Sequence, residues 1–318
     1  MAIFTLTCAT GAPGVTTTAL GLTLAWPRDV VLVDADRCAS QAVLAGYLNG
    51  VATGGRGLTS LAQSYRDGID IGTDLPSHMV PLRHGPSDGS LSTTQRWFIP
   101  GFARPGSANL FEPVWPELML ALGDLDRQGI DVILDAGRWG SRGLPVGVVA
   151  QTRCLAVVTR TGLRSLAALR LYAPDVTSAV AAESGCAAGL IVIGAGAPYG
   201  ATEVARHFGW PVWGEVPWQP ADASVLSDGA PPRPRYANRP LPRAYTTAAD
   251  QLRSIADRWD AQVGRTVDPP ALDALGDPAF RGPAYGRMTG EVSRMTGEVS
   301  RMTGEVGRMT GFTEAIHG

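Results

Sequence analysis

Short, almost wholly apolar runs alternate with longer stretches in which apolar residues recur at helical spacing, as far as about residue 259. Short apolar runs are typical of strands buried on both faces, and recurrence every three to four residues is typical of amphipathic helices. The predicted strands are residues 3–7, 30–33, 132–134, 155–158, 190–193 and 212–216. The predicted helices are residues 16–25, 40–48, 58–64, 116–127, 163–171, 201–208 and 246–259.

Strands that alternate with helices predict an α/β fold with a doubly wound, mostly parallel sheet. Between residues 67 and 107 the pattern dissolves into Gly, Pro, Ser and scattered aromatic residues, so we expect an excursion over the surface there. In sheets of this kind ligands bind at the carboxyl ends of the strands. Gly11, Asp34, Asp36 and Asp135 all fall at or just after predicted strand ends, so that edge is the candidate site.

The composition changes after the last predicted helix, and a seven-residue unit, R-M-T-G-E-V-S, recurs from Arg287 onwards. We expect a folded domain over residues 1–262 and a flexible, disordered tail over residues 263–318. Met and Val lie four apart in each unit, which allows a helical stripe, but the Gly in each unit disfavours a helix by about 1 kcal/mol. The repeats either give avidity for a partner or are an expansion without a selected role.

Composition narrows the function classes. The net charge of −2 argues against a generally basic nucleic-acid binder, and all 27 basic residues are arginines. The four cysteines are widely spaced and form no CxxC pair, so we expect reduced core thiols rather than a metal site or disulfides. The sequence contains no apolar stretch long enough to span a membrane and does not begin as a signal peptide, which favours a cytoplasmic location.

The segment 10–18, T-G-A-P-G-V-T-T-T, joins the first predicted strand to the first predicted helix. A glycine-rich loop between a strand and a helix is the context in which backbone amides and the helix dipole hold a nucleotide phosphate. The amides expected around such a phosphate are those of Gly11, Ala12, Gly14, Val15, Thr16 and Thr17. The loop alone is also compatible with a tight strand–helix turn that binds nothing.

Three aspartates strengthen the phosphate-loop interpretation. Asp34 and Asp36 form a D-A-D motif after the second strand, where one carboxylate orders an attacking water and the other the shell of a Mg²⁺ ion. We therefore take both as candidate catalytic residues. Asp135 ends a later apolar strand, and we expect it to hold Mg²⁺ through water while Thr16 ligates the ion directly. Each aspartate alone would more often be a cap or turn residue.

These motifs resemble the deviant P-loop ATPases of the ParA/MinD family, which belong to the SIMIBI class of P-loop NTPases. Residues 10–17, the D-A-D motif and D-A-G-R-W-G at 135–140 stand where that family has K-G-G-x-G-K-T-T, D-x-D and D-x-x-x-G. The resemblance extends over about residues 1–259 and implies binding of ATP with Mg²⁺. It is closer to a lysine-free, MinD-like branch that we associate with Tad-type pilus or secretion loci, which implies a localisation factor similar to TadZ and CpaE.

The chain departs from that family at three places. The family has lysines where Thr10 and Val15 stand, one reaching the partner's nucleotide across a dimer and the other binding the β- and γ-phosphates. It also has an aspartate where Gln219 stands, in the loop after the last strand. The missing lysines predict weaker nucleotide binding and a larger loss of catalysis. Arg37, Arg138 and Arg160 follow strand ends and are candidates to replace the missing charge.

We therefore expect a positioning or assembly factor that binds ATP weakly and hydrolyses it slowly or not at all. The resemblance also implies a homodimer and a partner such as a pilus or secretion ATPase or a polar-localisation protein. The alternatives are a nucleotide-free scaffold, an ATPase assisted by an arginine, and a ParA-type partitioning protein that binds DNA. The arginines available for DNA are Arg233, Arg235, Arg239 and Arg243. The tail is not strongly basic, so we expect no direct membrane binding.

Overall fold

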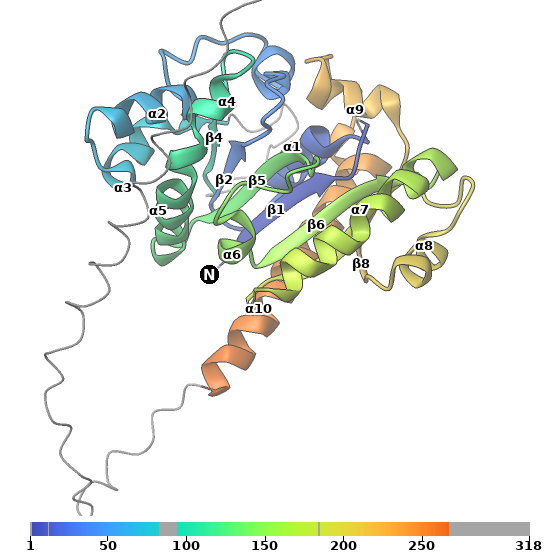
Figure 1. Cartoon of the computed structure of the whole chain (residues 1–318). Coiled ribbons are helices and arrows are strands. Elements are labelled where there is room, and N and C mark those ends of the chain that lie inside the picture. Colours follow the sequence, from blue (N-terminus) through green and yellow to red (C-terminus); the bar gives the residue numbers. More distant parts are fainter. Residues whose placement is uncertain (1, 12, 83–93, 184, 267–318) are drawn as a thin grey trace, which may run out of the picture. The chain divides into compact units, whose positions relative to one another are not determined.

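Eight strands form one sheet in a computed structural model of the chain, which describes residues 2–11, 13–82, 94–183 and 185–266 (Figure 1). The strand order is β3-β4-β2-β5-β1-β6-β7-β8, and neighbours run parallel except β3, which is antiparallel to β4. The strands are β1 Ile3–Cys8, β2 Val30–Asp34, β3 Val80–Pro81, β4 Arg96–Ile99, β5 Asp131–Arg138, β6 Cys154–Arg160, β7 Ala187–Ile193 and β8 Val212–Val216.

Helices connect successive parallel strands and cover the sheet. The α-helices are α1 Val15–Ala25, α2 Leu58–Arg66, α3 Ile71–Asp74, α4 Ser107–Leu110, α5 Trp115–Arg127, α6 Val148–Gln151, α7 Leu163–Ala181, α8 Ala201–Phe208, α9 Pro220–Ser227 and α10 Pro240–Thr266. A π-helical turn, η1 Val43–Tyr47, and three 3₁₀ turns, η2 Leu75–His78, η3 Glu112–Val114 and η4 Tyr236–Asn238, complete the described elements. The predicted α/β class with a doubly wound, mostly parallel sheet is confirmed.

Both faces of the sheet are buried because successive side chains of each strand point to opposite faces. In β6, Ala156 joins the core cluster that includes α1 and α10, whereas Leu155 and Val157 join the cluster under α7 and α8. A third cluster lies between β2, β5 and helices α2 to α5. Two layers of helices therefore enclose the sheet, as continuous apolar strands require.

The expected surface excursion over residues 67–107 is wrong in part. This segment contains β4, which pairs in parallel with β2, and β3, which pairs with β4. Phe98 and Ile99 are fully buried, and the Arg96 side chain donates to the backbone oxygens of Thr23 and Trp26 at the end of α1. The three-residue apolar run W-F-I is too short to predict a strand from sequence. In the structure it belongs to β4, which extends the sheet beside β2.

Other elements differ in length from the prediction. The helix expected over residues 40–48 is only the turn η1, and Gly46 there lies so close to the end of α9 that a Cβ would meet the Ser227 carbonyl oxygen at 2.1 Å. Helix α7 continues through Pro174 to Ala181, past the expected end at residue 171. Helix α10 begins at Pro240 because proline is tolerated in the first turn, and it continues past residue 262 to Thr266.

The remaining expectations concern the tail, the thiols and the membrane. The predicted tail and its repeats lie outside the described residues from residue 267 onwards, and α10 occupies the residues just before them. Cys8, Cys154 and Cys186 are free and buried, as expected for core thiols, but Cys38 is exposed, so that expectation is wrong for this one cysteine. Across the described residues, no helix combines the length and apolarity needed to cross a bilayer.

Candidate functional site

The loop between β1 and α1 directs backbone amides toward the carboxyl edge of the sheet. Gly11 has φ +76° and Gly14 has φ +110°, both in the left-handed region that side chains rarely adopt. The first helical hydrogen bond runs from the Thr18 amide to the Gly14 oxygen, so the amides of Val15, Thr16 and Thr17 precede the intrahelical ladder. Ala12 lies outside the described residues. Within the described residues these amides donate to no acceptor, so the N-terminus of α1 offers free donors and a positive dipole end to an anion.

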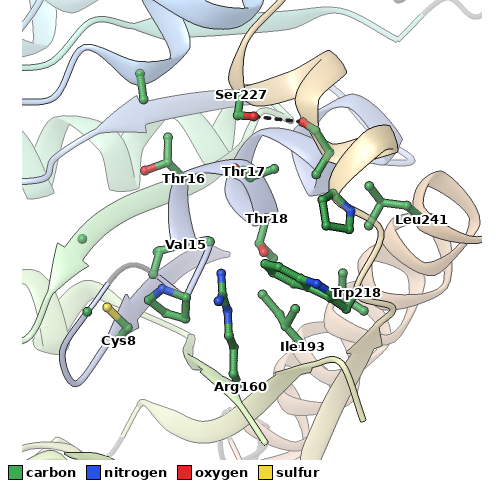
Figure 2. Close-up of a pocket in the computed structure, with 18 of the residues that line it drawn as sticks. Cys8, Val15, Thr16, Thr17, Thr18, Arg160, Ile193, Trp218, Ser227 and Leu241 are labelled. Carbon is green, nitrogen blue, oxygen red and sulfur yellow. Dashed lines mark hydrogen bonds between the residues drawn. The ribbon is translucent and has the colours of Figure 1, made fainter. Parts of the chain in front are cut away.

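A cavity of about 530 Å³ opens against this loop (Figure 2). Such a volume suits a small-molecule ligand. Its polar part is lined by Gly11, Gly14, Thr16, Thr17, Asp36 and Arg138. Its apolar part is lined by Ile193, Val216, Pro217, Trp218, Leu241 and Tyr245. The cavity therefore joins an anion-binding edge to an apolar floor, as a ligand with a charged end and a flat apolar end requires.

The two positions where the resemblance implies lysines carry no cation. Val15 is only 6% exposed and packs in the apolar core against the α1 face of the sheet, so its contribution to an anion is its backbone amide. Thr10 is exposed at the tip of the loop. Gln219, at the third departure, lines the cavity at the N-terminal boundary of α9.

The predicted aspartates come together at the ends of β2 and β5. Asp34 and Asp135 are register partners in the sheet, and the Asp36 side chain lies over Gly137, where a Cβ would meet its Cγ at 2.1 Å. Gly101 also lies close to Asp34, since a Cβ there would meet the Asp34 Cγ at 2.7 Å. Burial raises the pKa of Asp34, and the neighbouring charges of Asp135 and Asp36 raise it further. Asp36 lines the cavity, whereas Asp34 is buried and does not line it.

Asp135 has one oxygen engaged and one without a hydrogen-bond partner among the described residues. Its Oδ1 accepts from the Gly137 amide at 3.0 Å, and its buried Oδ2 accepts no hydrogen bond. Burial raises the pKa of Asp135, while the nearby Thr16 hydroxyl and the Gly137 amide oppose that rise. An unsatisfied buried carboxylate oxygen next to a hydroxyl is a donor set that suits a hydrated Mg²⁺ ion.

These residues fit Mg²⁺ only together with a phosphate ligand. In the described part of the chain, no group of three or more His, Cys, Asp or Glu side chains is arranged to hold a metal ion alone. Mg²⁺ usually keeps several waters and is bound through one or two carboxylates plus substrate phosphates. Thr16 and Asp135 would hold it in that manner, with the phosphates supplying the remaining oxygens.

The three candidate arginines have different surroundings. The Arg37 guanidinium donates to the backbone oxygens of Trp139 and Gly143 and does not line the cavity. Arg138 lines the cavity, and its Nε donates to the Gly11 oxygen at 2.9 Å, which joins the phosphate loop to the end of β5. Arg160 lines the cavity at the end of β6, with its guanidinium carbon 4.0 Å from the centroid of the Trp218 ring.

Sequence reasoning missed the apolar floor of the cavity. Leu241 and Tyr245 come from the first turns of α10, which precede residue 246, where the predicted helix begins. The ring of Tyr245 packs on Gly21 of α1, where a Cβ would meet it at 2.3 Å. The glycine in the middle of the first helix was the available signal, because a helix interior keeps a glycine mainly where another element approaches closely.

The arginines considered for DNA are engaged in part within the fold. Arg239 donates through Nε to both carboxylate oxygens of Asp222, at 2.6 and 2.8 Å, and Asp222 is only 1% exposed. The Tyr236 hydroxyl also donates to the Asp222 backbone oxygen. This pair joins η4 to α9, so Arg239 neutralises a buried carboxylate rather than presenting a charge to an external phosphate.

Comparison with solved structures identifies the fold family of this chain. No protein-family model matches the sequence, and no curated protein matches it in sequence. The septum site-determining protein MinD of Pyrococcus horikoshii, solved with Mg-ADP, matches with a TM-score of 0.59 at 16% identity, over 81% of this chain and 98% of that one.

Two further solved structures are similar to this chain in fold. A chain of the MinC:MinD cell division complex of Aquifex aeolicus matches with a TM-score of 0.55 at 14% identity, over 80% of this chain and 96% of that one. A ParA family ATPase of Chlorobium tepidum matches with a TM-score of 0.55 at 18% identity, over 78% of this chain and 98% of that one. The chain therefore has the P-loop NTPase fold of the MinD and ParA ATPases.

Proposed function

We propose that this protein is a nucleotide-binding positioning or assembly factor that holds ATP or ADP with Mg²⁺ and hydrolyses ATP slowly or not at all. The observation that carries the proposal is the cavity at the N-terminus of α1, bounded by two left-handed glycines. A cavity of this size, with amides at one end that have no acceptor among the described residues, fits an anionic ligand better than it fits a purely structural turn.

Each part of a nucleotide has a matching part of the cavity. The phosphates belong at the amides of Gly14, Val15, Thr16 and Thr17, and the base belongs over the apolar floor near Trp218. The Thr16 hydroxyl and the unsatisfied Asp135 oxygen suit the hydrated cation that accompanies the phosphates. A solved structure with the same fold, the Pyrococcus horikoshii MinD, contains Mg-ADP.

Slow hydrolysis follows from the residues that are absent. Asp36 borders the cavity and Asp34 lies behind it, so Asp36 is the better placed of the two to order a water. Positive charge on a transferring phosphoryl group contributes about 10³–10⁵ in rate. Without lysine at positions 10 and 15, the chain keeps the water-ordering carboxylates and loses most of that contribution.

Such a protein would use its nucleotide to bias assembly. A ligand shifts an equilibrium between states only by its differential affinity for them, so ATP and ADP would favour different assembly states, including a homodimer. The finer assignment, a role beside a Tad-type pilus or secretion ATPase, is supported by the sequence resemblance in the loop, the D-A-D motif and residues 135–138. Sedimentation with ATP and with ADP, with and without that candidate partner, tests this part.

Calorimetric titration with ATP, with and without Mg²⁺, tests the binding. We expect saturable binding that Mg²⁺ strengthens, and we expect Thr16→Ala to remove most of the Mg²⁺ effect while leaving the fold intact. Phosphate release by the same preparation should stay near the uncatalysed background. If neither ATP nor ADP produces a binding heat in the wild-type protein, the chain is a nucleotide-free scaffold and the proposal fails.

A further inference from the structure

Among the described residues, two cationic side chains line the cavity, and they stand on opposite sides of the phosphate loop. Arg138 ends β5 and Arg160 ends β6, and these strands flank β1 on either side. Arg138 already donates to the Gly11 oxygen, and its charge opposes the rise that burial causes in the pKa of the neighbouring Asp36. Arg138 therefore lies on the carboxylate side of the site and contacts the loop backbone.

Arg160 has different neighbours. Its guanidinium stacks on the indole of Trp218, and Figure 2 shows the side chain extending toward the loop between Val15 and Trp218. Trp218 lies in the loop after β8 and is 54% exposed. Ile193, at the end of β7, lies beside this pair and also lines the cavity. A cation is thus held over an aromatic face at the junction of the polar and apolar parts of the cavity.

Stacking suits an arginine that must also bind a phosphate. The aromatic ring contacts the flat face of the guanidinium, and the N–H groups point outward in its plane, where they can pair with phosphate oxygens. A planar guanidinium binds phosphate in a bidentate manner and keeps its charge at any physiological pH.

We propose that Arg160, positioned by Trp218, contributes a positive charge to the binding of the nucleotide's phosphates and so replaces part of what a lysine in the loop would give. This inference rests on the proposed function, since it concerns how the same site holds its ligand. It implies selectivity for nucleoside diphosphates and triphosphates over monophosphates, because the added charge interacts most strongly with the more highly charged phosphate chain.

Calorimetric titration with Mg-ADP and with AMP tests the role of Arg160. Arg160→Met should weaken Mg-ADP about 10- to 100-fold, the loss expected for one charge-assisted hydrogen-bonding group, and should change AMP binding much less. Arg160→Lys should retain part of the affinity. Arg164→Met, at an exposed position on α7, is the matched control and should bind Mg-ADP like the wild type.

The outcomes separate this inference from the proposed function. If the wild type binds Mg-ADP and Arg160→Met binds it equally well, the role of Arg160 is refuted and nucleotide binding stands. An equal loss for AMP and Mg-ADP would also refute it, because the side chain would then act on the whole site. A wild-type protein that binds no Mg-ADP refutes both.

Trp218 is a positioning residue, and its test is rescue by another aromatic side chain. Trp218→Ala should weaken Mg-ADP severalfold, whereas Trp218→Phe, which keeps an aromatic face for the guanidinium, should restore most of the affinity. In the Arg160→Met background, the same two substitutions should differ less in Mg-ADP affinity than they do when Arg160 is present. If Trp218→Ala and Trp218→Phe both bind like the wild type, the stack does not position Arg160.

Discussion

At the residue scale, the position of the Asp34 carboxyl group lowers the stability of the fold. It is buried beside Asp135, with Asp36 close by, and both burial and the neighbouring charges disfavour its ionised form. Gly101 lies over it so closely that no side chain would fit there. Residues that lower stability in this way are concentrated at functional sites, which is consistent with a site that acts on a ligand.

Removing one of these charges should therefore stabilise the protein without ligand. We expect Asp34→Asn to raise the melting temperature by about 2–4 °C, which corresponds to roughly 1 kcal/mol in a domain of this size. Asp250→Asn, on an exposed turn of α10, is the control and should change it little. Thermal unfolding followed by circular dichroism measures both, and a lower melting temperature for Asp34→Asn would contradict this account of the carboxylate cluster.

At the element scale, hydrophobic pattern predicts helices and strands well where the pattern is strongly periodic. Helix α8 and strand β8 have the predicted bounds, and the phosphate loop begins and ends within one residue of its expected place. The pattern fails for β4 because this strand has only four residues, one polar and three apolar, which is too few to reveal a repeating pattern. It fails for the start of α10 because two prolines in a first helical turn look like a connector.

The packing of α1 on α10 can be tested with two glycines in helix interiors. Gly21→Ala should cost about 1–3 kcal/mol, since its Cβ would meet the Tyr245 ring at 2.3 Å and the ring must move. Gly123→Ala in α5 meets no atom closer than 3.6 Å and should stabilise by about 0.5–1 kcal/mol through helix propensity. Urea unfolding measures both, and a loss of stability at both positions would show that the close α1–α10 contact is not what distinguishes them.

At the scale of the whole molecule, the candidate site is assembled from segments far apart in the sequence. The cavity takes residues from the ends of β1, β5, β6, β7 and β8 and from the starts of α1, α9 and α10. The sequence predicts the loop and the aspartates, because each follows a strand that can be recognised locally. It does not predict which strands are neighbours, so the pairing of Arg160 with Trp218 and the floor formed by Tyr245 could not be foreseen.

The fold of the chain places the candidate site, and the chemical groups at that site determine what it binds. The fold is that of the MinD and ParA ATPases, and it puts the N-terminus of α1 at the edge where such sheets bind ligands. Whether a nucleotide is held there depends on backbone amides, because the chain has no lysine to assist them. The most direct test observes those amides themselves.

Amide hydrogen exchange of the full chain, followed by mass spectrometry with and without saturating Mg-ADP, makes that observation. Our account predicts that exchange slows in the peptide containing Gly14, Val15, Thr16 and Thr17 when Mg-ADP is added, and that exchange in α7 is unaffected. Exchange in this loop that is the same with and without Mg-ADP would contradict the claim that its backbone holds the phosphates.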